Sequence, residues 1–296
     1  HKRSHTANCK PGEIDRNAVR CSFFTKSAMK KTIVLLAAAM SAVAAFGWGQ
    51  KGHDTVAYIA EKHLSEAAAD SVASLLDGKS PVYWANWLDN ASHTPDYAYT
   101  KTWHYKNIDT GTPYDEAPTI KSGDVVSAAR EQIAILADSV STRSQKQLAL
   151  KILIHLIGDM HCPGHNFFED KSQNVNFYLD DNEKFRFHKF FDGGVFEKGH
   201  KWYYADYVYH LDRCSDEEKA EIVEGSLIEW EEANARIMRP LYDIITPERK
   251  FDKAETLDFL QDMIQLTDNQ LLKAGYRLAH VLNSVFDPSY SPKWER

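Results

Sequence analysis

Twice in this chain a histidine is followed by an aspartate four residues later, a spacing that places the two side chains side by side on an α-helix. His155 and Asp159 lie four residues apart within an apolar helical pattern, and His188 and Asp192 repeat the spacing. Residues four apart stack on one helix face, so each pair can bind a common metal ion. A single pair is as often a structural hydrogen bond, but the repeat favours metal. The fold is then constrained to bring these distant segments together.

Further residues have the same chemistry. His53 follows Trp48 by five positions, Asp89 ends an aromatic segment, and His104 stands in Trp103-His104-Tyr105. His165 follows Pro163-Gly164, which breaks the helix and lets the chain turn back. The structural alternatives are that Asp89 caps a helix and that His104 packs in the core. His161 faces away from the His155–Asp159 pair, so we interpret it as a structural histidine or one that supports a metal ligand without binding the metal. Imidazole and carboxylate ligands without thiolate suit zinc, although manganese or another divalent ion uses the same ligand types.

An apolar run precedes Trp48 and has the form of a secretory signal. Residues 33–46 follow Lys30 and Lys31 and are about 14 residues long, short of the roughly 20 that span a membrane. Small residues at 45 and 47 suit signal peptidase. We therefore expect 29–47 to be a signal peptide, with a retained anchor or buried helix as the alternative, and 1–28 to be an upstream extension or expression remnant. The signal would direct export to the periplasm or the medium, without stable membrane association. Its cleavage would free the Trp48 amino group for metal binding.

The remaining residues, 48–296, form an acidic chain. Removing 1–47 takes eight Lys or Arg and two Asp or Glu from totals of 35 and 42, leaving a net charge of −13. Such a protein cannot hold nucleic acid through a wide basic face, so bound cations would have to supply positive charge at phosphate. The length suffices for one domain, and we expect a monomer. Cys162 and Cys214 remain, and either a disulfide or two free thiols is compatible with an exported protein.

Helical periodicity dominates these residues. It predicts a mainly α, single-domain multi-helix bundle. The only convincing extended part is a small β-hairpin, Asn176–Leu179 and Lys184–Phe187, joined by Asp180-Asp181-Asn182. The expected helices are one continuing from His53, then Glu66–Leu76 after Ser65, Tyr83–Leu88, Asp124–Val140, Gln145–Met160 after Ser144, one from the Ser215/Glu218 capping box to about Met238, and Ala254–Phe286.

Taken together, the motifs are similar to those of the secreted zinc-dependent single-strand nucleases of the S-one/P-one type, which share a fold with bacterial zinc phospholipases C. The similarity runs from Trp48 to about Val285. It comprises Trp-Gly-x3-His at 48–53, Trp-x-Asp at 87–89, Trp-His-Tyr at 103–105, His-x2-Gly-Asp-Met-x2-Pro-x-His at 155–165, His-x3-Asp at 188–192, and Ala-Gly-Tyr-Arg-Leu-Ala at 274–279.

The resemblance implies three zinc ions and assigns their ligands. The first is held by Asp89, His104, His155 and Asp159, the second by Trp48, His53 and Asp159, and the third by His165, His188 and Asp192. A water shared by the two ions that Asp159 bridges would lose its proton near neutral pH and act as the nucleophile. The implied activity is hydrolysis of single-stranded RNA or DNA to 5′-phosphate products, with 3′-nucleotidase activity as an option.

Substrate residues are implied less directly. Tyr105 occupies the position of an aromatic residue that stacks a base, with core packing as the alternative, and Asn107 and Asn174 occupy positions near the base. The chain departs from the family at Ser92, where relatives have Arg, at Asn107, where they have Asp, and at Ser172-Gln173, where they have Gly-Gly. Two other functions stay open: a phospholipase C-like phosphodiesterase and a non-catalytic exported zinc-binding protein. The short Trp48–His53 spacing and Asp192, in place of Glu, favour the nuclease.

Overall fold

Packed α-helices form the framework of the fold, as the apolar periodicity predicts. The computed structural model describes residues 48–167, 175–292 and 294; the predicted signal peptide and Asn174 lie outside these ranges. In chain order the helical segments are α2 (Gln50–Lys62), α3 (Glu66–Leu75), α4 (Pro81–Trp84), α5 (Trp87–Ala91), η1 (Pro95–Thr100), η2 (Tyr114–Glu116), α6 (Val125–Ala137), α7 (Arg143–Met160), η3 (Pro163–His165), α8 (Phe187–Lys189), η4 (Phe190–Gly194), α9 (Val195–Lys198), α10 (Tyr204–Leu211), α11 (Asp216–Val223), α12 (Leu227–Ile244) and α13 (Lys253–Phe286).

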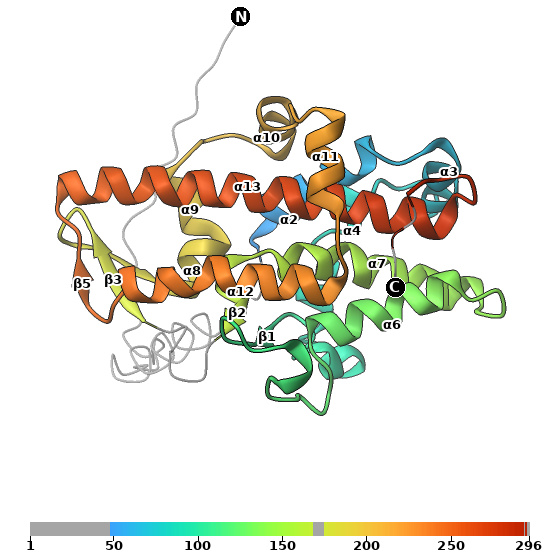
Figure 1. The fold of residues 1–296 in the computed structure, drawn as a ribbon, viewed down its shortest axis with the longest axis horizontal. Coiled ribbons are helices and arrows are strands. Elements are labelled where there is room, and N and C mark those ends of the chain that lie inside the picture. The colour runs from blue at the N-terminus through green and yellow to red at the C-terminus, as the bar shows by residue number, and fades with distance from the viewer. Residues whose placement is uncertain (1–47, 168–174, 293, 295–296) are drawn as a thin grey trace, which may run out of the picture. The chain divides into compact units, whose positions relative to one another are not determined.

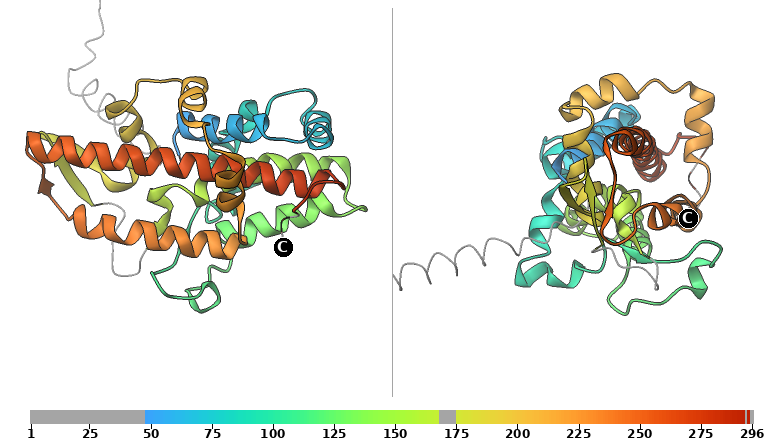
Figure 2. Two further views of the ribbon diagram at one scale, coloured as in Figure 1. Left: turned by 45° about the horizontal axis from the view of Figure 1, so that its top comes forward. Right: turned by 90° about the vertical axis from the view of Figure 1, so that its left-hand side faces the viewer.

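The long helix α13 organises the bundle (Figure 1). It contacts α2, α3, α6, α7, α9 and α11, and α6 packs along α7. Figure 2 shows these helices gathered around α13 when the bundle is turned. Their apolar faces meet in one large buried cluster that includes Val56, Ile133, Leu153 and Leu271. Among the described residues, no helix combines the length and apolar character needed to cross a membrane. The predicted mainly α fold is confirmed.

Local capping explains where several helices begin. The Ser65 hydroxyl accepts from the amide of Ala68 and starts α3, as predicted. The cap of α7 is Thr142, paired with Gln145 in a capping box, so the predicted start after Ser144 is two residues late. A cap satisfies amides that have no partner inside the helix, and it works at any position where the side chain reaches them.

Two predicted helices are each divided in two. The capping box of Ser215 and Glu218 is confirmed, but α11 ends at Val223 and a second box, Ser226 with Glu229, starts α12. Gly225 lies between them with φ of 94°, a left-handed conformation that glycine adopts without strain. The predicted helix to Met238 is therefore wrong. The predicted aromatic helix Tyr83–Leu88 similarly separates into α4 and α5.

A small three-stranded sheet lies at one end of α13 (Figure 1). Strands β3 (Asn176–Leu179) and β4 (Glu183–Arg186) form the predicted antiparallel hairpin. Strand β5 (Arg249–Lys250), between α12 and α13, adds to β3 in parallel. A separate parallel pair, β1 (Lys106–Asn107) and β2 (Asn166–Phe167), was not predicted. Two-residue strands carry too short a pattern to be recognised from sequence.

Candidate metal centre

The proposed ligands come from six separate segments, and the fold brings all of the side-chain ligands into two adjoining clusters. His155 and Asp159 are four apart on α7, and both side chains are fully buried. His53 comes from α2, Asp89 from α5, and His104 from the turn after η1. His165 ends η3, and His188 and Asp192 lie on the consecutive helical turns α8 and η4. The turn η4 is a π-helix, a form that is frequent at functional sites.

Asp159 is the centre of the first cluster. Its Oδ2 atom lies 2.8 Å from His104 Nδ1 and 3.0 Å from His155 Nε2. Asp89 Oδ1 lies 3.4 Å from the same His155 nitrogen and 3.8 Å from His104 Nδ1. The structure therefore brings together the four residues predicted for one ion. The capping and core-packing alternatives for Asp89 and His104 do not explain this convergence.

The second oxygen of Asp159 faces a different histidine. Asp159 Oδ1 lies 3.4 Å from His53 Nε2, and the His53 and His155 rings stack with centroids 3.9 Å apart. Helix α2 can approach this closely because Gly158 faces it, where a Cβ atom would lie 2.9 Å from His53 Nδ1. The Trp48 side chain is also close to Gly158 and is fully buried. One carboxylate thus faces two groups of nitrogen donors.

The second cluster contains His165, His188 and Asp192. The Nε2 atoms of His165 and His188 are 3.0 Å apart, and His188 Nε2 lies 3.4 Å from Asp192 Oδ1. His165 also lies 3.5 Å from Asp159 through its Nδ1 atom. The two clusters are therefore adjacent. The three residues predicted for the third ion are together.

Backbone carbonyls fix the tautomers of two histidines. His155 Nδ1 donates to the Ala85 carbonyl at 2.7 Å, and His165 Nδ1 donates to the His104 carbonyl at 2.6 Å. A carbonyl only accepts, so in each neutral ring the lone pair is on Nε2, which points into a cluster. This outer hydrogen bond is the usual orienting device of metal-binding histidines.

Burial and mutual charge change the acidity of these groups. Burial by itself would raise the pKa of Asp159, but the positive charges of His155 and His165 hold that pKa well below its usual range. Burial, followed by repulsion from Asp89 and Asp159, raises the pKa of Asp192 well above its usual range. Burial lowers the pKa of His188 to about 3. Crowded carboxylates and imidazoles form an environment that a divalent cation stabilises.

Several buried atoms in the clusters have no hydrogen-bond partner among the described residues. They are both ring nitrogens of His53 and the carboxylate oxygens Asp89 Oδ1, Asp159 Oδ1 and Asp192 Oδ2. Buried polar atoms are normally paired, and an unpaired one is costly. A bound metal ion would satisfy them, and the nitrogen and oxygen donors fit zinc. The residues present therefore fit the metal that the sequence predicts.

A polar network holds the end of α7 in place behind the ligands. His161 Nδ1 donates to the Ile157 carbonyl, and its Nε2 accepts from Arg277 at 2.8 Å, so both nitrogens are used away from the clusters. Asn234 and Gln270 donate to the carbonyls of Met160 and His161. The structural interpretation of His161 agrees with these contacts. The donors to this end of α7 lie far away in sequence, Asn234 on α12 and Gln270 and Arg277 on α13.

Two of the predicted substrate residues, Tyr105 and Asn107, follow His104 directly in the chain, and the third, Asn174, lies outside the described residues. Tyr105 is half-buried, and Asn107 lies on β1 with its Oδ1 atom buried and unpaired among the described residues. Ser92 is fully buried and its hydroxyl donates to the Asp89 carbonyl, so it cannot take the place of a phosphate-binding Arg. Cys162 and Cys214 are both free, so the disulfide option is not observed.

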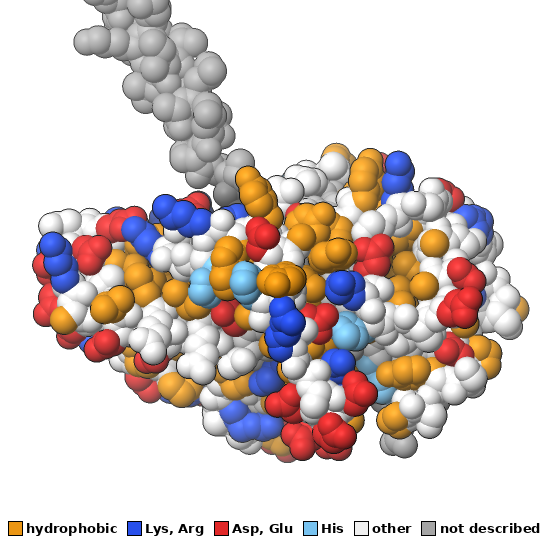
Figure 3. Space-filling view, turned by 90° about the horizontal axis from the view of Figure 1, so that it is seen from above, with side chains coloured by type: hydrophobic (Ala, Val, Ile, Leu, Met, Phe, Trp, Pro, Cys, Tyr) orange, Lys and Arg blue, Asp and Glu red, His pale blue; other side chains and the backbone are white. Residues whose placement is uncertain are grey.

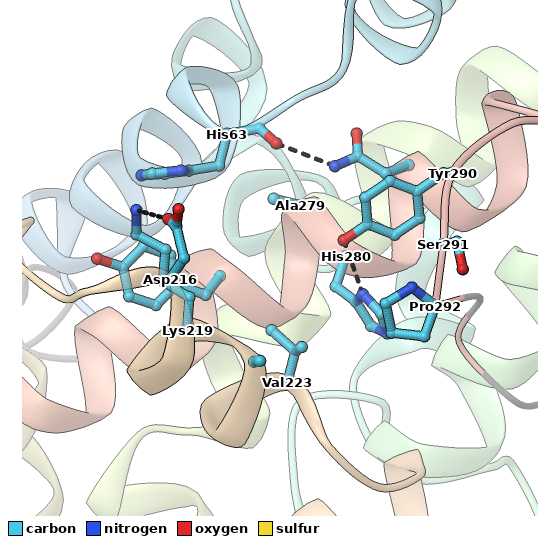
Figure 4. Close-up of a pocket in the computed structure, with 12 residues that line it drawn as sticks. His63, Asp216, Lys219, Val223, Ala279, His280, Tyr290, Ser291 and Pro292 are labelled. Carbon is cyan, nitrogen blue, oxygen red and sulfur yellow. Dashed lines mark hydrogen bonds and ion pairs between the residues drawn. The ribbon is translucent and has the colours of Figure 1, made fainter.

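A separate cavity of about 380 Å³ lies between the end of α2, α11 and α13 (Figure 4). His63, Lys219, His280 and Tyr290 contribute to its lining. Several of its polar groups already have partners: Lys219 binds Asp216, and Tyr290 binds His280 Nδ1 at 3.0 Å. This cavity lacks the crowded carboxylates of the two His/Asp clusters, so we do not assign the chemistry to it.

The charges on the surface are mixed. On the face drawn in Figure 3, Lys and Arg alternate with Asp and Glu, and the coloured side chains there form no continuous basic area. This agrees with the acidic composition.

Comparison with known proteins gives a family match. A family model described as S1/P1 Nuclease matches residues 48–287. The chain is similar to Nuclease S1 of Aspergillus oryzae, with 32% identity over 130 residues, 41% of this chain and 45% of the relative. It is similar to Nuclease P1 of Penicillium citrinum, with 30% identity over 127 residues, 40% and 47% of the two chains. The chain therefore spans about half the length of these two fungal relatives. It aligns with Endonuclease 2 of Arabidopsis thaliana over 277 residues at 26% identity, which is 81% of this chain and 91% of the relative.

Proposed function

The chain belongs to the S1/P1 nuclease family, and we propose from this membership that it is an exported, zinc-dependent phosphodiesterase acting on single-stranded RNA or DNA. The products would carry 5′-phosphates, and 3′-nucleotides would serve as additional substrates. The observation that carries the proposal is the convergence of His53, His104, His155 and Asp89 on the two oxygens of Asp159. The second cluster lies within 3.5 Å of the same carboxylate.

The proposal includes three zinc ions with the ligand sets predicted from the sequence. Bound ions would supply positive charge at the phosphate and lower the pKa of a water molecule that attacks phosphorus. The protein contributes the fixed positions of the donors. Asp159 serves two groups of donors at once, and the backbone carbonyls of Ala85 and His104 orient the imidazoles. Because these groups are held before substrate arrives, no reorganisation is needed during the reaction.

The strand after His104 would bind the base. Tyr105 would stack on an unpaired base and Asn107 would contact its edge, together with Asn174. Stacking is tolerant of base identity and requires an exposed base, which favours single strands over duplex. Because Ser92 is buried against Asp89, one phosphate contact would be missing, and the ions and Asn107 would carry more of the binding.

Processing before Trp48 completes the proposed site. The family match begins at Trp48. The neighbouring amide of Gly49 donates to the Asp192 carbonyl, which fixes this part of the chain against η4. The Trp48 and His53 side chains both lie close to Gly158. A free amino group at Trp48 would add a donor to the ion shared by His53 and Asp159.

One experiment tests the proposal against both alternatives. Protein that begins at Trp48 is assayed with zinc and after chelation on single-stranded RNA, single-stranded DNA, duplex DNA, a 3′-nucleotide and phosphatidylcholine. Asp159→Asn is compared with Asp216→Asn, a matched change at an exposed aspartate. A version with one extra residue before Trp48 tests the amino group.

We expect zinc-dependent hydrolysis of single strands with 5′-phosphate ends, lost in Asp159→Asn and kept in Asp216→Asn. Hydrolysis of the lipid alone would replace the proposal with a phospholipase. Zinc binding without hydrolysis of any substrate would leave a non-catalytic binding protein.

A further inference from the structure

One buried thiol adjoins the second metal cluster. Cys162 is fully buried, and its Sγ atom lies 3.9 Å from Asp192 Oδ1. One donor atom from each of Cys162, His165 and Asp192 lies within 4.8 Å of the other two. We propose that Cys162 is a fourth protein ligand of the ion held by His165, His188 and Asp192. This inference deepens the proposed function and depends on its third metal ion.

The backbone holds Cys162 between ligand segments. Its amide donates to the Asp159 carbonyl at 2.9 Å, and its own carbonyl accepts from the His165 amide at 3.0 Å. The residue therefore sits three positions after one ligand and three before another, at the junction of α7 and η3. A side chain at this junction is fixed by the same turns that place the ligands.

The contact with Asp192 is not sufficient as a hydrogen bond. At 3.9 Å it is near the outer limit for sulfur, and a thiol is a weak donor. The other carboxylate oxygen, Asp192 Oδ2, is buried and has no hydrogen-bond partner among the described residues. A cation between the thiol, the carboxylate and the imidazoles would satisfy all of them.

The donor set then becomes one sulfur, two nitrogens and one oxygen. Zinc accepts thiolate, imidazole and carboxylate in tetrahedral sites. On binding, a Zn–S bond replaces the S–H bond and the thiol proton passes to solvent. Four protein donors fill a tetrahedral shell, so this ion would be held firmly and would bind phosphate only as a fifth ligand. The other cluster, without sulfur, would keep its open positions.

X-ray absorption at the zinc edge tests the proposal directly. Protein beginning at Trp48 is loaded with zinc, and its total metal is measured by elemental analysis. We expect a sulfur neighbour at about 2.3 Å from zinc, present in wild type and in Cys214→Ser and absent in Cys162→Ser. Cys214 is the matched control because it is the other free cysteine and packs near Ile59 and Tyr276 instead.

Cobalt substitution gives a second, spectroscopic readout, in which the wild-type protein already shows whether a thiolate binds the metal. Cobalt-loaded wild type and Cys214→Ser should show a thiolate-to-cobalt charge-transfer band that Cys162→Ser lacks. Chelator titration should release one ion from Cys162→Ser at least about 10-fold more readily than from wild type, since even outer partners of a ligand contribute that much.

The two proposals fail in different ways. Active, fully loaded wild type with only nitrogen and oxygen neighbours at zinc would overturn the role of Cys162 and leave the nuclease proposal intact. A clear sulfur signal in a protein that cleaves no nucleic acid would support the Cys162 ligand and overturn the nuclease proposal.

Discussion

Lys106 provides a quantitative test of how the strand after His104 is held. Its side chain is 2% exposed. The ammonium group lies 3.1 Å from Asp124 Oδ2, 3.0 Å from the Pro118 carbonyl and 4.5 Å from the centre of the Tyr114 ring. Lys106→Met keeps the apolar stem and removes the charge. Asp124, a residue that is 4% exposed, would then be buried without its cation.

The size of the effect follows from the contacts that remain. Removing one partner of a buried ion pair typically costs about 3–5 kcal/mol. Asp124 keeps the Tyr114 hydroxyl and the amides of Val126 and Ser127, so we expect the low end, about 3 kcal/mol. In the double variant Lys106→Met/Asp124→Asn, the amide oxygen can still cap α6 and no charge is stranded. We expect the double variant to recover to within about 1–2 kcal/mol of wild type.

Urea unfolding of the zinc-loaded proteins measures both values, with metal content checked for each. A loss below about 1 kcal/mol in Lys106→Met, the range of exposed pairs, would refute the buried-pair reasoning. A double variant that is less stable than Lys106→Met would also refute this reasoning, because the expected recovery depends on removing the unpaired charge of Asp124.

Three further outcomes follow from particular contacts. A Cβ atom at Gly49 would lie 2.5 Å from the Asp192 carbonyl oxygen, so Gly49→Ala should lower the metal content by one ion in elemental analysis. Gly193→Ala is the control, because a Cβ atom there meets open space and the metal content should stay unchanged. Equal metal content in the two variants would disprove the link between Gly49 and the ligand Asp192. Tyr105→Ala should raise KM for single strands by an amount equivalent to about 1–3 kcal/mol with unchanged metal content; an unchanged KM would favour core packing. Burial raises the pKa of Asp268 to about 7. Between about pH 4 and 7 the folded state therefore binds more protons than the unfolded state, and stability falls as pH rises. Asp268→Asn should accordingly be about 1–2 kcal/mol more stable than wild type at pH 8, with a smaller difference at pH 4.5 in urea unfolding; a difference that grows toward low pH would reverse the sign of the argument.

The parts of the fold that the sequence predicts are those set by near neighbours. The His155–Asp159 spacing places both side chains on one face of α7, and Ser215 with Glu218 marks a helix start because a cap acts within one turn. The hairpin of β3 and β4 is predicted for the same reason. The single predicted helix to Met238 fails at Gly225, where one left-handed residue outweighs a continuing apolar pattern.

The sequence predicts the residue types of the candidate metal centre, but their grouping is a property of tertiary structure. That Asp159 faces His53 with one oxygen and His104 with the other depends on how α2 and the turn after η1 pack against α7. The same packing pairs β1 with β2 and connects His161 to Arg277. It also places Cys162, which carries no recognisable ligand spacing in the sequence, beside Asp192. Spacing encodes contacts within a turn, whereas contacts between segments arise only when the helices bury their apolar faces together.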